Sequence, residues 1–131
     1  MDWKYLLTSF EGRINRKPFW LTAIACGIGY GILFYIISSV FGTFTPTDQP
    51  GNYGMQLTTP GWILVGILYI AIIWFGLALQ VKRWHDRNKS GWWVLINLVP
   101  LIGGIWALVE TGFLAGTPGP NRFGEDPLAG K

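Results

Sequence analysis

The residues best suited to chemistry lie in one polar stretch, "VKRWHDRNKSGWW" (residues 81–93), between two long apolar runs. His85 stands next to Asp86, and an imidazole beside a carboxylate can transfer a proton near neutral pH. Such a pair can also begin a metal site, but the chain has one histidine and one cysteine, Cys26. A zinc site needs three or four ligands, so we expect no metal and no other cofactor.

A structural interpretation of the same stretch is equally specific. Arg83, Asp86 and Arg87 have the spacing of side chains that pair along the end of a helix, at i,i+3 and i,i+4. The polar residues would then form a hydrogen-bonded loop that holds the two flanking apolar segments together. The residue types alone leave both interpretations open.

Two further polar clusters flank the apolar runs. In "FEGRINRKPFW" (10–20), the basic side chains either bind anionic headgroups, at about 1 kcal/mol per charge, or set the topology, beside an aromatic belt. In "GTPGPNRFGEDP" (116–127), glycine and proline predict turns, and no GxxxxGK[ST] phosphate loop occurs. The residues predicted to bind a headgroup or an anionic ligand are Arg13, Arg16, Lys82, Arg83, His85, Asp86 and Arg122.

The composition identifies the elements that must position these clusters. Half of the 131 residues are hydrophobic and 13% are charged, whereas soluble domains carry about 25% charged residues. The sequence therefore predicts an all-α integral membrane protein with one domain. The net charge of +3 is explained by topology, so we expect no nucleic acid as a partner.

Three apolar segments are long enough to be considered membrane spans, which need about 20 residues. They run over 19–41, 62–81 and 92–115. The third is interrupted by Pro100, Gly103 and Gly104, which weaken a helix. It is either a single kinked span or a re-entrant hairpin whose backbone is covered by protein.

The remaining segments lie outside the spans. Residues 2–14 have apolar side chains at helical spacing and predict an amphipathic interfacial helix. The 42–60 loop is rich in Gly, Pro and Thr and is expected to be irregular. Residues 116–131 form a Gly/Pro-rich tail.

Charge predicts the orientation. Lys and Arg are absent from the 42–60 loop and frequent both before the first span and in the 82–90 loop. The positive-inside rule then places the N-terminus and the 82–90 loop in the cytoplasm. The C-terminus falls outside if the third segment spans the membrane, and inside if that segment is re-entrant. The first 20 residues contain no apolar core of a cleavable signal peptide.

Two features inside the apolar segments also invite a role. Glu110 is the one acidic residue there, and intramembrane carboxylates are costly and often functional. Gly27 and Gly31 form a GxxxG pattern on the first span, which favours close packing with another helix.

Three motifs together resemble a known family. They are G-R-x-x-R from Gly12 to Arg16, R-x-H-D from Arg83 to Asp86, and G-T-x-G-x-N-R-[FY]-G from Gly116 to Gly124. In this order the chain resembles the domain-of-unknown-function-805 (DUF805) family, the YhaH-like small bacterial inner-membrane proteins. The resemblance covers nearly the whole chain, although the long 42–60 loop departs from the usual form. It implies a multi-pass protein of the bacterial cytoplasmic membrane and brings no known activity or catalytic residue.

We therefore expect a non-enzymatic membrane protein whose polar clusters bind an anionic lipid headgroup, an anionic ligand or a partner protein. One alternative is an oligomeric transporter or channel subunit that assembles through Gly27 and Gly31, with Glu110 lining the path. A second alternative is an enzyme acting on lipid headgroups, with His85 and Asp86 as acid–base groups. The expected partners of the protein are membrane lipids, a second copy of the chain or another membrane protein.

Overall fold

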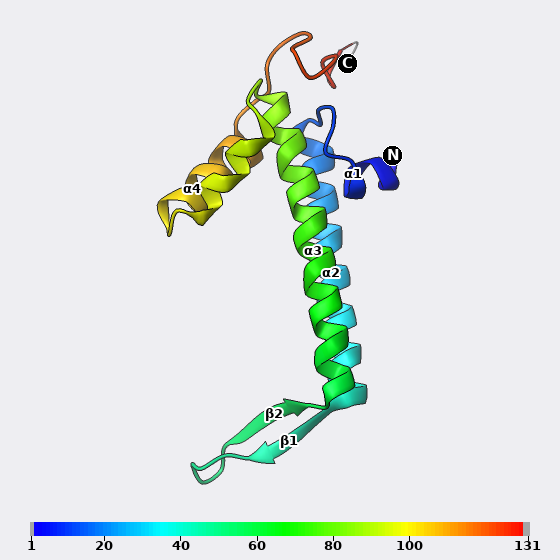
Figure 1. The fold of residues 1–131 in the computed structure, drawn as a ribbon, viewed down its shortest axis with the longest axis vertical. Helices are drawn as coiled ribbons and strands as arrows, with labels where there is room; N and C mark the ends of the chain where they lie inside the picture. Colours follow the sequence, from blue (N-terminus) through cyan, green and yellow to red (C-terminus); the bar gives the residue numbers. More distant parts are fainter. Residues whose placement is uncertain (1, 130–131) are drawn as a thin grey trace. The chain divides into compact units, whose positions relative to one another are not determined.

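Two long helices dominate the computed structural model, which describes residues 2–129 (Figure 1). Helix α2 (Arg16–Phe41) and helix α3 (Thr59–Asp86) are connected by the strands β1 (Gly42–Pro46) and β2 (Tyr53–Leu57). The chain forms two compact units. One contains Ala25–Ile72, and the other contains the residues up to Ile24 together with those from Ile73 onward. The residues predicted to bind a headgroup or an anionic ligand all belong to the second unit.

Both long helices have the length and apolarity of membrane spans. With 26 and 28 residues they extend about 39 and 42 Å at 1.5 Å per residue, which exceeds a hydrocarbon core of roughly 30 Å. Their large side chains face outward, with Ile28 60% and Ile70 69% exposed. Such exposure is unfavourable in water and natural in lipid. The predicted spans over 19–41 and 62–81 lie within these helices.

The predicted interfacial helix over 2–14 is too long. Helix α1 covers Trp3–Thr8 only, and its first turn is capped by the Asp2 carboxylate, which accepts from the Tyr5 N–H at 3.2 Å. The chain then turns, with Gly12 at a positive φ of 84°. The apolar residues of this segment still point inward, since Leu6 and Ile14 are buried against Leu79. Apolar spacing identified the buried side chains but not the end of the helix.

The prediction of an irregular loop over 42–60 is also wrong, because most of this segment is a β-hairpin. The two strands pair antiparallel, with Phe44 opposite Met55. A turn reverses the chain, where the Asn52 N–H donates to the Gln49 carbonyl at 3.1 Å and Gly51 takes a φ of 82°. Pro followed by Gly at the centre is typical of a type II turn.

The third apolar segment is a helical hairpin and not one continuous helix. It consists of the 3₁₀ helix η1 (Gly91–Leu98), the short helix α4 (Ile102–Ala107) and a π-helical extension, η2 (Leu108–Phe113). The Trp93 and Trp106 rings lie 6.4 Å apart, so the two arms fold back on each other. The arms meet closely at Gly103, where a Cβ would collide with the Ile96 carbonyl. Among the described residues only α2 and α3 reach spanning length, so a third membrane span is not confirmed.

Candidate functional site: an arginine–aspartate cluster at the end of helix α3

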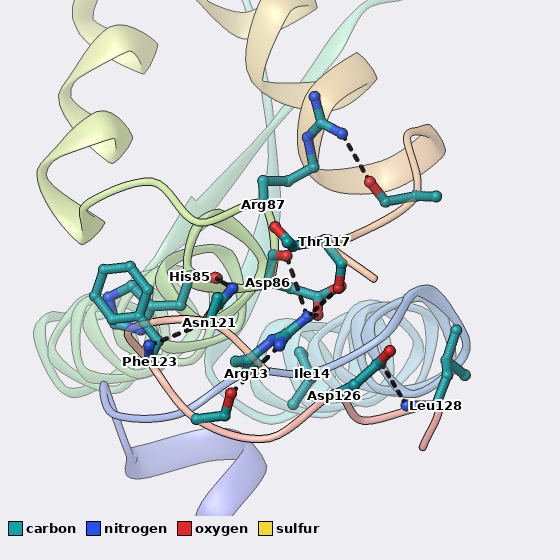
Figure 2. Close-up of polar contacts among 12 residues, drawn as sticks. Arg13, Ile14, His85, Asp86, Arg87, Thr117, Asn121, Phe123, Asp126 and Leu128 are labelled. Atoms are coloured by element: carbon teal, nitrogen blue, oxygen red, sulfur yellow. Dashed lines mark hydrogen bonds and ion pairs between the residues drawn. The ribbon is translucent and has the colours of Figure 1, made fainter. Parts of the chain in front are cut away.

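A buried carboxylate, Asp86, lies between two buried arginines, Arg13 and Arg83, at the end of α3. Figure 2 shows its pairing with Arg13. The Arg13 side chain reaches one oxygen of Asp86 from Nε at 3.0 Å and from Nη2 at 2.9 Å. Nη1 of Arg83 donates to the other oxygen, the i,i+3 pairing expected from the sequence. All three side chains are at most 4% exposed, so each charge depends on the others for compensation.

The remaining donors of Arg13 hold the C-terminal tail. Its Nη1 donates to the Gly119 carbonyl at 2.8 Å, and its Nη2 donates to the Thr117 carbonyl at 2.7 Å (Figure 2). The Thr117 N–H in turn donates to the main-chain carbonyl of Asp86 at 2.7 Å. One arginine near the N-terminus therefore attaches the tail to the end of α3.

The remaining donors of Arg83 hold two other segments. Nη1 donates to the Ile14 carbonyl at 2.9 Å, Nε to the Thr111 carbonyl at 2.6 Å, and Nη2 to the Leu114 carbonyl at 2.8 Å. Its guanidinium thus joins the N-terminal segment and the helical hairpin to α3. Its hydrogen-bonding capacity is used within the chain, which favours a framework role.

Lys82 is bonded within the chain in the same way. Its ammonium group has three donors, and they reach the carbonyls of Tyr5, Leu6 and Ser9 at 2.7–2.8 Å. The first two carbonyls belong to α1 and the third to Ser9, the residue that caps its C-terminal end. A helix leaves carbonyls without intrahelical partners at this end and attracts cations there. Lys82 therefore fixes the short helix against α3.

His85 contacts the tail and not the neighbouring carboxylate. Its Nδ1 lies 2.9 Å from the Gly12 carbonyl, and its ring stacks on Phe123 with centroids 3.9 Å apart. The Asn121 amide donates to the main-chain carbonyl of His85 at 2.9 Å (Figure 2). Both oxygens of Asp86 are directed at arginines. This arrangement gives no support to a His85–Asp86 acid–base pair.

Side chains from three elements cap the end of the helical hairpin. Five consecutive carbonyls, from Thr111 to Ala115, each accept a hydrogen bond from a side chain. The donors are Arg83 to Thr111 and Leu114, Trp20 to Gly112, Arg16 to Phe113 and Arg87 to Ala115. A helix end leaves its last carbonyls unpaired, and cations stabilise that end. Four of these five bonds come from arginines, which explains much of the basic charge here.

Glu110 is a paired carboxylate. It accepts from Lys89 at 2.5 Å, from the Trp106 indole at 3.1 Å and from Arg87 at 3.4 Å. The Lys89 ammonium also lies 4.9 Å from the centre of the Trp93 ring, within cation–π range. Glu110 therefore binds the helical hairpin to the polar loop after α3.

The tail has its own internal hydrogen bonds. The N–H groups of Leu128 and Gly119 donate to Asp126, each at 2.9 Å, and hold the pKa of that carboxyl below its usual value. Arg122 is exposed, and it donates to the Asn88 carbonyl at 3.3 Å. The tail therefore stays close to the polar loop along most of its length.

A cavity of about 400 Å³ opens beside the arginine–aspartate cluster. The start of α2 and the tail segment 115–118 line it, together with Arg83, Asp86 and Asp126. Arg16 and Lys17 also line it, and both side chains are exposed, in contrast to Arg13 and Arg83. These two cations have the accessibility that ligand binding requires.

Several residues of the cluster were missed by sequence reasoning. The sequence assigned Trp20 only to the aromatic belt, Lys89 only to the 82–90 loop and Asn121 only to the motif from Gly116 to Gly124. Gly116 was identified as part of a motif without a reason, and the structure supplies one. A Cβ on Gly116 would overlap the Asp86 carboxylate. The signal that unites these residues is contact across more than 20 positions, which single-sequence patterns do not contain.

The predicted packing pair on the first span lies in the other unit. A Cβ added to Gly27 or Gly31 would meet no atom within 4 Å among the described residues. Helix association through these glycines therefore stays a prediction.

The comparisons with known proteins agree with the family resemblance. Residues 7–125 match the family described as "Protein of unknown function (DUF805)". The chain is 36% identical over 133 residues to the inner membrane protein YhaH of Escherichia coli strain K12, covering 97% of both chains. It is 31% identical over 123 residues to the inner membrane protein YhaI of that strain, covering 92% of this chain and 87% of the relative. No solved structure matches the chain. The chain therefore belongs to the DUF805 family of membrane proteins.

Proposed function

We propose that the chain crosses the membrane twice and that its N-terminus and C-terminus both lie in the cytoplasm. The support is the contact set of Arg13, which bonds simultaneously to the end of α3 and to the tail. A bilayer cannot lie between groups that are in hydrogen-bond contact. Both termini and the 82–90 loop then share one side, and the basic charge in these segments makes it the cytoplasmic one.

The helical hairpin then enters one leaflet and returns. Its first arm, the eight residues of η1, extends about 16 Å at 2.0 Å per residue, roughly half of the hydrocarbon core. Trp92, Leu98 and Leu101 are 78–80% exposed, so the hairpin presents apolar side chains that lipid would cover. Its helical arms satisfy most of their own backbone groups, as a lipid environment demands.

Thiol labelling in intact cells tests this topology. In a Cys26→Ala background we expect Asp48→Cys to react with a membrane-impermeant maleimide, because the turn between β1 and β2 would lie outside. Glu125→Cys in the tail should react only after the membrane is permeabilised. Labelling of Glu125→Cys in intact cells, with Lys89→Cys protected, would instead require a third crossing.

We further propose that the cytoplasmic end binds the phosphate of an anionic lipid headgroup in the cavity beside the cluster. The observation that carries this proposal is the pair of exposed cations, Arg16 and Lys17, on the cavity wall. The nearby carboxylates already have partners within the chain, since Asp86 is paired with two arginines and Asp126 accepts two N–H groups. Exposed guanidinium and ammonium groups beside a membrane favour phosphate.

In this division of roles the other predicted binding residues form the framework. Arg13, Lys82, Arg83 and Asp86 hold the segments together, and His85 and Arg122 hold the tail. The buried ion pairs of Arg13 and Arg83 with Asp86 keep the walls of the cavity in place. The proposed activity is recognition of a headgroup, without a chemical step.

Thermal stabilisation of the detergent-solubilised protein by added lipid tests the headgroup proposal. Phosphatidylglycerol should raise the melting temperature of the native chain more than phosphatidylcholine does. Lys17→Gln should reduce that difference, and R16Q with K17Q should abolish it, because about 1 kcal/mol of attraction is lost with each charge.

Lys4→Gln is the matched control for these variants. Lys4 is an exposed lysine on α1, carries the same charge and does not line the cavity. It should leave the lipid response unchanged. An equal reduction by K4Q and K17Q would mean that net charge, and not the cavity, determines lipid binding.

A further inference from the structure

The β1–β2 hairpin has one apolar face and one polar face. In an antiparallel pair, residues directly opposite each other lie on the same face, and the faces alternate along each strand. From the register, one face carries Gly42, Phe44, Pro46, Tyr53, Met55 and Leu57. The other face carries Thr43, Thr45, Gly54 and Gln56. The alternation is complete over both strands, which is typical of a sheet with one face on an apolar environment.

The apolar face is turned toward the ends of the two helices. Leu57 belongs to this face and is buried, at 7% exposure. Its Cβ lies 3.4 Å from the position that a Cβ on Gly61 would take, and that position is 2.8 Å from the Cβ of Phe41. Phe41 ends α2 and Gly61 lies in the first turn of α3. The face that contains Leu57 therefore continues the apolar surface of the helices.

The rest of that face has no cover among the described residues. Phe44 is 75% exposed, Tyr53 66% and Met55 39%. A lone two-stranded hairpin is marginally stable in water, and these side chains would add an unfavourable exposed patch. Only Asp48, in the turn, carries a charge between Lys17 and Lys82. The face can therefore enter an apolar environment without burying a charge.

We propose that the β1–β2 hairpin lies flat on the outer surface of the bilayer, with Phe44, Tyr53 and Met55 inserted into the lipid. No linker separates it from the helices, since β1 begins directly after Phe41 and α3 begins two residues after β2 (Figure 1). The hairpin is thus held at the level of the interface, where aromatic side chains are enriched. The polar face, with its threonines and glutamine, is exposed to water.

The chemistry of the face fits lipid better than a protein partner. It contains bulky, uncharged side chains and a tyrosine, a residue type that is enriched at membrane interfaces. The burial of Leu57 makes this face continue the apolar surface of the helices. A second copy could instead pair along the open strand edges. Spin labelling distinguishes contact with a second copy of the chain from contact with lipid. The choice of leaflet rests on the proposed topology, whereas burial of the face in lipid does not.

Site-directed spin labelling in vesicles of phosphatidylethanolamine and phosphatidylglycerol tests the proposal. In a Cys26→Ala background, nitroxides are attached at Met55→Cys and Phe44→Cys on the apolar face. Thr45→Cys and Gln56→Cys provide matched positions on the polar face of the same strands. Accessibility to oxygen, relative to accessibility to a water-soluble nickel chelate, measures immersion in lipid. We expect this ratio to be severalfold higher at 44 and 55 than at 45 and 56.

Three results would overturn the proposal. They are equal ratios on both faces, a higher ratio on the polar face, or spin–spin broadening at position 44 that disappears on dilution with unlabelled protein. The last result would assign the face to a second copy of the chain. Met55→Cys removes less bulk than Phe44→Cys, so position 55 with its neighbour 56 gives an answer even if Phe44→Cys disturbs the hairpin. The tail-labelling experiment tests the topology separately, so failure of one proposal is distinguishable from failure of the other.

Discussion

Replacing Asp86 with asparagine is expected to destabilise the protein by about 3–5 kcal/mol, more than any other single substitution in the cluster that leaves the size of the side chain unchanged. Asparagine keeps the size of the aspartate but removes its charge. Arg13 and Arg83, at 1% and 0% side-chain exposure, would then be buried without a counter-charge. Removing one member of a buried charge group costs far more than the group contributes as a whole, because the remaining charges stay desolvated.

The yield of folded protein and its melting temperature in mild detergent measure this effect. Glu125→Gln is the control, since it removes one carboxylate charge from an exposed position in the tail. We expect E125Q to behave like the native chain and D86N to be recovered poorly or to melt far lower. Equal melting temperatures of the two variants would contradict the central role of the carboxylate.

Replacing Gly116 with alanine is expected to release the C-terminal tail from the end of α3. The added Cβ would overlap the Asp86 carboxylate, and that carboxylate cannot move away because two arginines hold it. Overpacking of this kind costs about 1–3 kcal/mol. If the tail opens locally, its open population should rise at least about fivefold.

Trypsin cleavage after Arg122 in inside-out membrane vesicles measures the opening. The Arg122 side chain is exposed in the native chain, so burial of that side chain does not limit cleavage. The rate of cleavage is then limited by how often the surrounding tail detaches. Gly104→Ala is the matched control, because a Cβ there meets no atom within 4 Å in the part of the chain that the structure describes. Cleavage should accelerate in G116A and remain at the native rate in G104A. An unchanged rate in G116A would mean that the tail is not held against Asp86.

Some parts of the structure follow directly from the amino-acid sequence. The low charge and the two long apolar runs specified the two helices of α2 and α3, because lipid-exposed backbone must satisfy its own hydrogen bonds. The i,i+3 pair of Arg83 and Asp86 was predictable because both residues lie on one helix, where spacing determines contact. The family followed from motifs spread over nearly the whole chain.

Local patterns failed where a distant contact competes with local preference. Apolar spacing predicted a helix over 2–14, but α1 ends at Thr8, where the chain turns through Gly12 and Lys82 takes up the carbonyls of the helix end. The Gly, Pro and Thr content of the 42–60 segment predicted an irregular loop. Its apolar–polar alternation is nevertheless visible in the sequence once the register of the two strands is known.

The roles of the charged residues were decided by the tertiary structure alone. From the sequence, Arg13, Lys82 and Arg83 were indistinguishable from Arg16 and Lys17, since all five are cations beside an apolar segment. In the fold, the first three are buried and bonded to carbonyls up to 111 positions away. The other two are exposed, although Arg16 also donates to the Phe113 carbonyl. The physical reason is that side-chain type determines what a residue can bind, while burial and the position of main-chain acceptors determine what it does bind. Those acceptors are contributed by every residue alike, so no pattern of residue types reveals them.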